Sequence, residues 1–368
     1  MRYILLFSVL LFQHAICSAQ QLNNDKLLTA KLDSIITREF KESEPGGSLF
    51  IQKGNNILYS RSFGLADIVT KEKFTDNTVS NVGSITKTFV AYGILLLLKE
   101  GKLSLDDSII KYFPDFKNKE IARKVKIRHL LTHTSGLPDS RNVDRDSVFY
   151  LTANDEQNFA PLKQTDTLEF EPGSNWKYSN SAYNGLALII EKVSGMKWQT
   201  FIEKNIYKPA GMVHSKITDG AYPQNGVAHG YRKMNGHYEE YDYGECPTFD
   251  AAGNGGVWSS IEDLRKYVSA MKNCAFLDCN TIAFSQKVWY PENWKGKNPP
   301  SQGFSWFVYE PKHPDDYKVI NHSGSQGGFR AHLFMVPEPD ITIIWLTNND
   351  RSVTPLIINP LIQLGYLK

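Results

Sequence analysis

The sequence predicts an α/β fold of the α+β kind, in which an antiparallel sheet is built from both chain ends and flanked by helices. Three observations lead to it: strand patterns near the N-terminus, further strand patterns near the C-terminus, and helix signals, turns and loops between them. The strand patterns cover 48–52, 56–63, 304–309, 318–322, 330–336 and 341–346. We expect one lobe from about 24–102 and 261–368, a mostly helical second lobe from about 103–260, and a ligand cleft where the lobes meet.

Local patterns support these elements in chain order. Apolar residues at helical spacing predict an amphipathic helix over 24–42. Turn residues at 53–55 connect the first two strand patterns as a hairpin. The apolar run over 89–98 is too short to cross a bilayer and is typical of a buried helix, and Gly195 marks the end of a later helix.

The first residues are typical of an export signal. Arg2 precedes an apolar run over 4–12, and small residues follow up to Ala19. Polar residues end the run well short of the roughly 20 apolar residues that a membrane anchor needs. We therefore expect 1–19 to be a signal peptide and 20–368 to be a single periplasmic or secreted domain, with no stable membrane insertion once the signal is removed.

The cysteines predict at most one local disulfide. A lipoprotein site at Cys17 is the alternative to cleavage after Ala19, but bulky Ile16 precedes it where a small residue is usual. Cys274 and Cys279 are close enough to close a small loop in an oxidising compartment, which leaves Cys246 over. No histidine is spaced with these cysteines as a zinc site requires.

Charge and histidine spacing exclude two kinds of partner. The chain has 41 basic and 39 acidic residues, a formal net charge of +2, and no arginine-rich tract or lysine stripe. Nucleic acid is therefore not an expected partner. His129 and His133 have a spacing that metal sites also use, but no glutamate follows His129, so we interpret both as structural and expect no metal.

The strongest candidate nucleophile is Ser84. It precedes an apolar helix that continues through 88–95, so it lies in the first turn, where free backbone N–H groups and the helix dipole favour negative charge. Lys87 follows three residues later on the same helix face, within hydrogen-bond reach. A buried lysine can lose its proton and act as a base. The alternative is an N-cap serine beside a surface lysine.

The Ser-x-x-Lys pattern alone does not select this serine, because it occurs five times. The other four matches begin in a loop, near helix ends, or before a short segment that a proline ends, whereas Ser84 alone opens a long apolar helix. Those four serines are Ser108, Ser174, Ser194 and Ser269.

Two later segments carry residues that suit the same chemistry. Tyr178 and Asn180 are expected on a loop, where a phenol could shuttle the serine proton and an amide could bind a substrate amide. His322, Gly324 and Ser325 lie between two strand patterns, where glycine would let a substrate backbone approach and the Ser325 amide could join that of Ser84 in an oxyanion hole. The alternatives are a packed tyrosine, a helix-capping asparagine, and a glycine-rich turn.

Taken in order, these three motifs resemble the serine β-lactamase and penicillin-binding-protein superfamily, most closely its class C β-lactamase-like hydrolases and DD-peptidases. The segments 129–137 and 251–260 are also similar to segments usual in that family. The resemblance implies that Ser84 is the nucleophile, Lys87 its base, Tyr178 the proton shuttle and Asn180 a substrate contact. It implies an α/β sandwich with a helical lobe and no metal or organic cofactor.

The third motif departs from the Lys-Thr-Gly of that superfamily, because His322 replaces the lysine. The resemblance associates histidine there with some DD-peptidases, esterases and D-aminopeptidase-like enzymes. An imidazole holds a substrate carboxylate less firmly than an ammonium, which argues against efficient β-lactam hydrolysis and predicts more pH dependence near neutrality.

The expected activity is therefore hydrolysis of a small-molecule or peptide substrate, namely D-amino-acid peptides or cell-wall-type amides, as in a DD-carboxypeptidase. The alternatives are an esterase or weak β-lactamase of the same fold, and a non-catalytic protein that binds cell-wall peptides. The pattern does not predict an oligomeric state. Five aromatic residues could line the cleft, although each alone is more typical of a core: Trp176, Trp258, Phe304, Trp306 and Phe329.

Overall fold

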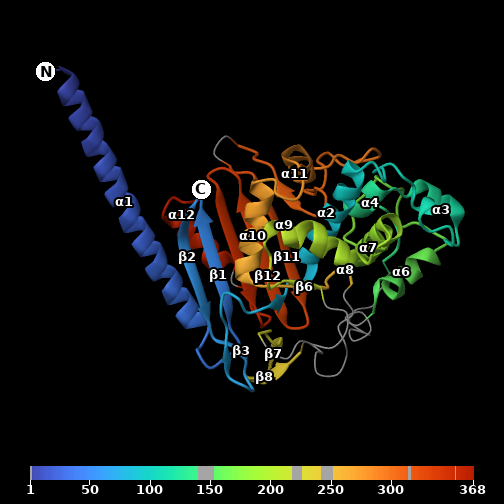
Figure 1. The fold of residues 1–368 in the computed structure, drawn as a ribbon, viewed down its shortest axis with the longest axis horizontal. Helices are drawn as coiled ribbons and strands as arrows, with labels where there is room; N and C mark the ends of the chain where they lie inside the picture. The colour runs from blue at the N-terminus through green and yellow to red at the C-terminus, as the bar shows by residue number, and fades with distance from the viewer. Residues whose placement is uncertain (1, 140–152, 218–225, 242–251, 314–315, 353) are drawn as a thin grey trace.

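A computed structural model describes residues 2–139, 153–217, 226–241, 252–313, 316–352 and 354–368. It confirms the predicted fold class: a six-stranded antiparallel sheet, in the order β10-β11-β12-β13-β1-β2, has helices packed on both faces (Figure 1). The strands are β1 (Gly47–Lys53), β2 (Asn56–Phe63), β10 (Phe307–Tyr309), β11 (Val319–Gln326), β12 (Phe329–Val336) and β13 (Ile341–Thr347). The two chain ends meet where β1 pairs with β13.

Two strands differ from the sequence prediction. The strand expected to begin at residue 304 begins at Phe307, because Ser305 has a positive φ of 70° that interrupts extended backbone. The strand expected to end at His322 continues to Gln326, so the third motif lies inside β11 and not between strands. The turn itself is Gly327-Gly328, whose φ angles of 48° and 81° suit glycine.

The sheet separates two hydrophobic cores. Alternate residues of a strand point to opposite faces, so Leu49 and Ile51 of β1 face one core while Phe50 faces the other. Helices α1 (Arg2–Glu39) and α12 (Thr354–Gln363) cover the first face. Helices α2 (Thr86–Lys99) and α10 (Ile261–Lys272) pack on the second.

The first helix is longer than expected. The predicted segment 24–42 is the second half of α1, whose first half projects away from the sheet (Figure 1). The helix ends at Glu39, three residues before the predicted end. Among the helices of the described residues, none combines the length and apolar character needed to cross a membrane.

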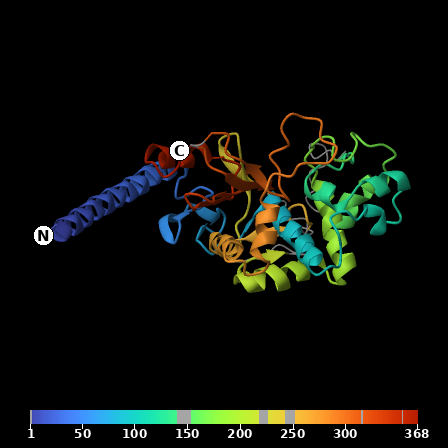
Figure 2. The same cartoon turned by 90° about the horizontal axis from the view of Figure 1, so that it is seen from above.

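The segment between the two halves of the sheet supplies most of the remaining helices, and Figure 2 shows α2 lying between those of 119–194 and the sheet. Eleven of the fourteen residues of α2 are buried, which explains why it is apolar on every side. These helices are α3 (Lys119–Lys124), α4 (Ile127–Leu131), α6 (Asp155–Lys163), α7 (Asn180–Ser194), α8 (Trp198–Ile202) and α9 (Lys208–Ala210). The predicted glycine end is confirmed, since Gly195 caps α7 with a φ of 71°.

Short elements complete the described part of the chain. The helical ones are η1 (Gly83–Ile85), η2 (Ile109–Lys111), η3 (Glu203–Tyr207) and α11 (Cys279–Ser285). The extended ones are β3 (Leu65–Asp67), β4 (Glu72–Lys73), β5 (Ser80–Asn81), β6 (Lys216–Ile217), β7 (Tyr231–Met234), β8 (His237–Glu240) and β9 (Val257–Ser259). Cys274 and Cys279 form a disulfide with their Cα atoms 5.1 Å apart, whereas Cys246 lies outside the described residues.

The packing of α1 on the sheet can be tested with two leucines of the same helix. Leu32 is fully buried in the first core and Leu27 is 44% exposed. We expect Leu32→Ala to lower the free energy of unfolding by about 2–5 kcal/mol, because it leaves a cavity. Leu27→Ala should change it by less than about 0.5 kcal/mol. Urea unfolding of both variants measures this, and equal losses would contradict the packing.

Candidate active site

Ser84 and Lys87 meet at the start of the buried central helix. Ser84 lies in the 3-10 turn η1, immediately before α2, and not in the first α-helical turn that the sequence predicts. Lys87 is fully buried, and its Nζ donates to Ser84 Oγ at 3.0 Å and to the carbonyl oxygen of Asn254 at 2.6 Å. A buried amine held against a hydroxyl is the arrangement that a serine nucleophile with a lysine base needs.

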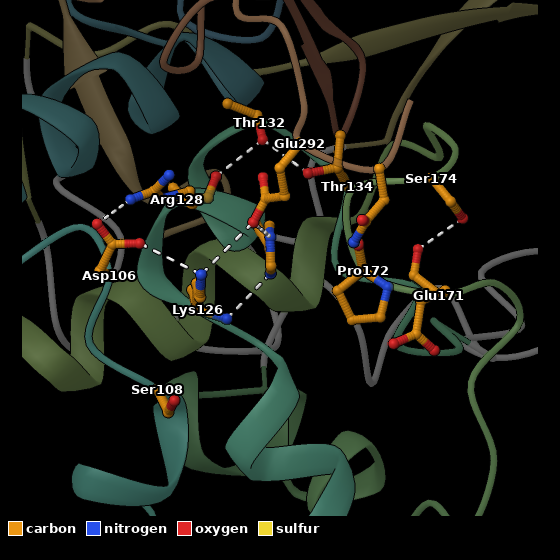
Figure 3. A network of polar contacts seen from close by, with 12 residues as sticks. Asp106, Ser108, Lys126, Arg128, Thr132, Thr134, Glu171, Pro172, Ser174 and Glu292 are labelled. Carbon is orange, nitrogen blue, oxygen red and sulfur yellow. Dashed lines mark hydrogen bonds and ion pairs between the residues drawn. The ribbon is translucent and has the colours of Figure 1, made fainter. Parts of the chain in front are cut away.

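The other four Ser-x-x-Lys matches have no such contact. In each of them the lysine pairs with a carboxylate: Lys111 with Asp107, Lys177 with Glu169, Lys197 with Glu191, and Lys272 with Asp340. Ser174 Oγ donates to the Glu171 carbonyl at 2.6 Å (Figure 3), and Ser108 Oγ donates to the Arg123 carbonyl at 2.6 Å. Among the described residues, only Ser84 is bonded to the lysine three positions later.

Two glycines bring the turn of Ser84 against strand β11. A Cβ atom on Gly324 would lie 1.9 Å from the Val82 carbonyl oxygen, and one on Gly83 would lie 2.6 Å from the Ser325 nitrogen. Gly324 was expected to leave space for a substrate backbone, but the carbonyl of Val82 from the same chain occupies the space beside its Cα. The backbone nitrogens of Ser84 and Ser325 both border this contact, since the Cβ added to Gly324 would lie 3.0 Å from Ser84 N and that added to Gly83 2.6 Å from Ser325 N. Two neighbouring N–H groups can serve as oxyanion donors.

Tyr178 lies over the lysine, on a loop that His133 holds from both sides. Lys87 Nζ is 5.1 Å from the centre of the Tyr178 ring, within cation–π distance. The His133 carbonyl accepts from Lys177 N at 2.9 Å, and its Nδ1 accepts from Ser179 N at 3.1 Å. Its ring lies 4.4 Å from that of Tyr178. Burial, followed by the charge of Lys87, lowers the pKa of His133 well below its ordinary value, so it is a neutral support.

Asn180 is the first residue of α7 and not part of the loop, which corrects the prediction for its position. The helix is capped by the side chain of Ser179. Asp139 adds a second cap, because its Oδ2 accepts from Asn180 N at 3.0 Å and from Ser181 N at 3.3 Å. Sequence patterns missed Asp139, since it is about 40 residues away and no local spacing connects it to this helix.

His322 lies on the wall of the cavity beside Ser84, but it is buried and uncharged. It is 1% exposed, its Nδ1 donates to the Ser323 carbonyl at 2.7 Å, and its ring lies 5.4 Å from that of Phe307. Burial, followed by the charge of Lys87, lowers the pKa of His322 to about 3. The imidazole is therefore neutral throughout the physiological range, which contradicts the pH dependence near neutrality that its residue type predicts.

A cavity of about 550 Å³ opens over Ser84, within the usual range for ligand sites. Trp176, Tyr178 and Phe307 form part of its wall. Of the five aromatic residues predicted for the cleft, only Trp176 lines this cavity, while the others are buried: Trp258, Phe304, Trp306 and Phe329. The core interpretation is therefore correct for those four.

Arg330 and Arg351 also line the cavity, and sequence patterns missed both. Arg330 pairs directly with Ser325 across β11 and β12, so the two side chains share a face. The two-residue turn after Gln326 implies this pairing and could have identified Arg330. Arg351 donates to the carbonyl of Glu39, whereas Arg330 is exposed and has no hydrogen-bond or ion-pair partner among the described residues.

His129, the first histidine of the pair whose spacing metal sites also use, belongs to a polar network. His129 Nδ1 accepts from Lys126 N at 3.1 Å, and its Nε2 lies 3.0 Å from Glu292 Oε1. Figure 3 shows Lys126 between Asp106 and Glu292, with ion pairs of 3.3 and 3.6 Å. Within the described ranges, no three or more His, Cys, Asp or Glu side chains are grouped to hold a metal ion.

Comparison with known proteins gives one family and several similar structures. The Beta-lactamase family profile matches residues 26–366. The chain is 29% identical to penicillin-binding protein 4* of Bacillus subtilis over 324 residues, covering 83% of this chain and 68% of that protein. Its fold is similar to the octameric penicillin-binding protein homologue of Pyrococcus abyssi, with a TM-score of 0.78, 27% identity and coverage of 91% and 77%. It is also similar to the D-amino acid amidase of Ochrobactrum anthropi, with a TM-score of 0.72, 21% identity and coverage of 94% and 98%.

The neutral state of His322 can be tested through stability. An unfolded histidine binds a proton near pH 6.5, whereas the folded His322 does so only near 3, so acidification below about 6.5 favours unfolding. Between pH 7.5 and 5, we expect the free energy of unfolding to fall by about 2 kcal/mol less in His322→Gln than in the wild type. Urea unfolding of both proteins at the two pH values measures the difference. Parallel losses would show that His322 is not held neutral.

Proposed function

The chain belongs to the beta-lactamase family of serine hydrolases, and we propose that it is an exported member that forms an acyl-enzyme on Ser84 and hydrolyses D-amino-acid peptides or cell-wall-type amides. The observation that carries the proposal is the 3.0 Å contact between Lys87 Nζ and Ser84 Oγ beneath an open cavity. A non-catalytic binding protein has no need of a buried lysine directed at a serine, since burying its charge is costly.

The proposed reaction uses residues already in place. Lys87 in its neutral form takes the proton of Ser84 Oγ as that oxygen attacks the substrate carbonyl carbon. The carbonyl oxygen becomes an oxyanion beside the backbone N–H groups of Ser84 and Ser325. The amide C–N bond then breaks as Tyr178 passes to the leaving nitrogen the proton that Lys87 took from Ser84. In the second half, water loses a proton to Tyr178 and Lys87 as it attacks the ester on Ser84. That proton returns to Ser84 Oγ as the ester C–O bond breaks and the acid product leaves.

The cavity wall supports a substrate that carries a carboxylate. His322 is neutral and buried, so it offers no positive charge. Arg330 is exposed on the same face as Ser325, and a guanidinium can bind a carboxylate through two hydrogen bonds. Trp176 and Phe307 supply apolar parts of the wall of the same cavity. A peptide with an apolar side chain and a free C-terminus fits this combination.

Export is part of the same proposal. The leader has the composition of a signal peptide with cleavage after Ala19, and the remaining 20–368 would act as one domain. The Cys274–Cys279 disulfide supports export, because disulfides persist mainly in oxidising compartments.

The acyl-enzyme can be tested by intact-mass spectrometry after exposure to a fluorophosphonate, a penicillin, a D-Ala-D-Ala peptide and a short acyl ester. We expect an adduct on Ser84 that Ser84→Ala abolishes. Lys87→Ala should slow its formation by at least ~10²-fold, because a general base is lost. Absence of any adduct or turnover would favour the binding protein, and an adduct on Ser108 or Ser194 would contradict the assignment.

The role of Arg330 can be tested with two substrates that differ in charge. We expect Arg330→Ala to lower kcat/KM for a peptide with a free C-terminal carboxylate by ~10-fold or more, because a charge-assisted hydrogen bond is lost. A neutral ester should change by less than about threefold, since it does not use that bond. Arg330→Lys, which keeps the charge but not the paired donors, should fall between. Equal losses on both substrates would remove Arg330 from carboxylate recognition.

A further inference from the structure

The carbonyl that accepts from Lys87 belongs to a short loop held at both ends. Asn254 supplies this carbonyl, at 2.6 Å from Lys87 Nζ. On one side, Gly253 N donates to Asp155 Oδ1 at 2.8 Å. On the other, the Gly255 carbonyl accepts from an asparagine side chain at 3.1 Å. The direction of the acceptor is therefore set by two side chains that do not touch Lys87 in these contacts.

The asparagine on the second side also connects the loop to the nucleophile. Asn81 Nδ2 makes the bond to Gly255, and Asn81 Oδ1 accepts from Gly83 N at 2.7 Å, in the turn that carries Ser84. Asn81 therefore connects the loop that carries the Lys87 acceptor to the turn that carries Ser84.

Asp155 holds the first side from another part of the fold. It is the first residue of α6, is 7% exposed, and its Oδ1 also accepts from Asn184 Nδ2 of α7 at 2.7 Å. Burial raises the pKa of Asp155 to about 7, which shows how poorly the site suits a charge. An oxygen acceptor is nevertheless present there, bonded to the two donors.

The loop has no room to shift toward α7. A Cβ atom on Gly253 would lie 2.6 Å from the Ala187 Cβ and 2.9 Å from the Tyr183 carbonyl oxygen. The close contact on this side and the hydrogen bond to Asp155 together restrict the position of the Gly253 amide. A single hydrogen bond therefore has a strong effect on where the next carbonyl points.

We propose that Asp155 is a positioning residue, which holds the Gly253 amide so that the Asn254 carbonyl meets Lys87 and directs its amine at Ser84. The proposal rests on the proposed function in taking Lys87 as the base. The nitrogen of a lysine sits on a flexible chain and its N–H groups rotate freely, so fixed acceptors are needed to orient it. Ser84 Oγ is one of the acceptors of Lys87 and the Asn254 carbonyl is another. This carbonyl also favours the protonated form of Lys87, because it accepts hydrogen bonds from an ammonium.

The experiment uses three variants of the full chain. Asp155→Ala removes the acceptor, and Asp155→Asn keeps an oxygen in its place without the charge. Asn158→Ala is the matched control, since Asn158 is fully buried one turn later in α6 and its amide donates to the Ala153 and Asn154 carbonyls. Far-UV circular dichroism establishes folding, and Asp155→Ser, whose shorter side chain ends before Gly253 N, replaces Asp155→Ala if that variant does not fold.

Two readouts are compared, the rate of Ser84 acylation by the fluorophosphonate and the NMR titration of Lys87 with lysines labelled at Cε. We expect Asp155→Ala to slow acylation by about 10–100-fold, as misplacement of a general base does, and to move the Lys87 titration midpoint to lower pH. Asp155→Asn and Asn158→Ala should stay within about threefold of the wild-type rate with an unchanged midpoint. A loss of stability alone does not move that midpoint.

The outcomes separate this proposal from the proposed function. An unchanged midpoint and rate in Asp155→Ala overturns the positioning role while Ser84 acylation stands. An equal shift in Asn158→Ala overturns it as well, because the effect would then belong to α6 in general. If the wild-type chain is not acylated at Ser84 but the midpoint still moves in Asp155→Ala, the hydrolase role fails and the positioning of Lys87 stands.

Discussion

The site depends on the contact between the turn of Ser84 and strand β11. Gly83 and Gly324 let two backbones approach more closely than any side chain would allow, since an added Cβ at either position would lie within 2.6 Å of a backbone atom. The contact joins the N-terminal end of α2 to the sheet. It thereby places Ser84 beside Ser325 and opens the cavity over both.

A second constraint is the burial of the lysine. Its Nζ donates to a hydroxyl and to a carbonyl and lies near the rings of Tyr178 and Tyr183. Low polarity disfavours charge, so the same surroundings hold the neighbouring imidazoles of His133 and His322 neutral. Arg330 supplies positive charge on the cavity wall, whereas the neutral histidine of the third motif does not.

Much of the fold could be predicted because its signals are local. The β1–β2 hairpin, the buried helix after Ser84 and the glycine end of α7 follow from turn residues and apolar spacing. The predictions that were wrong concern residues whose structure depends on contacts with distant parts of the sequence. Strand β11 extends through the third motif because β12 pairs with it. Gly324 leaves space for the carbonyl of Val82, which comes from the N-terminal part of the chain.

The sequence by itself determined the fold class, the choice of Ser84 among five similar tetrapeptides, and the family, because each depends on residue types at short spacing. The tertiary structure alone decided how these residues act on one another. It showed that His322 is buried, that Asp139 caps α7, and that Arg330 faces the cavity. Burial and the joining of distant backbones arise only when both chain ends form one sheet, so no local pattern could contain them.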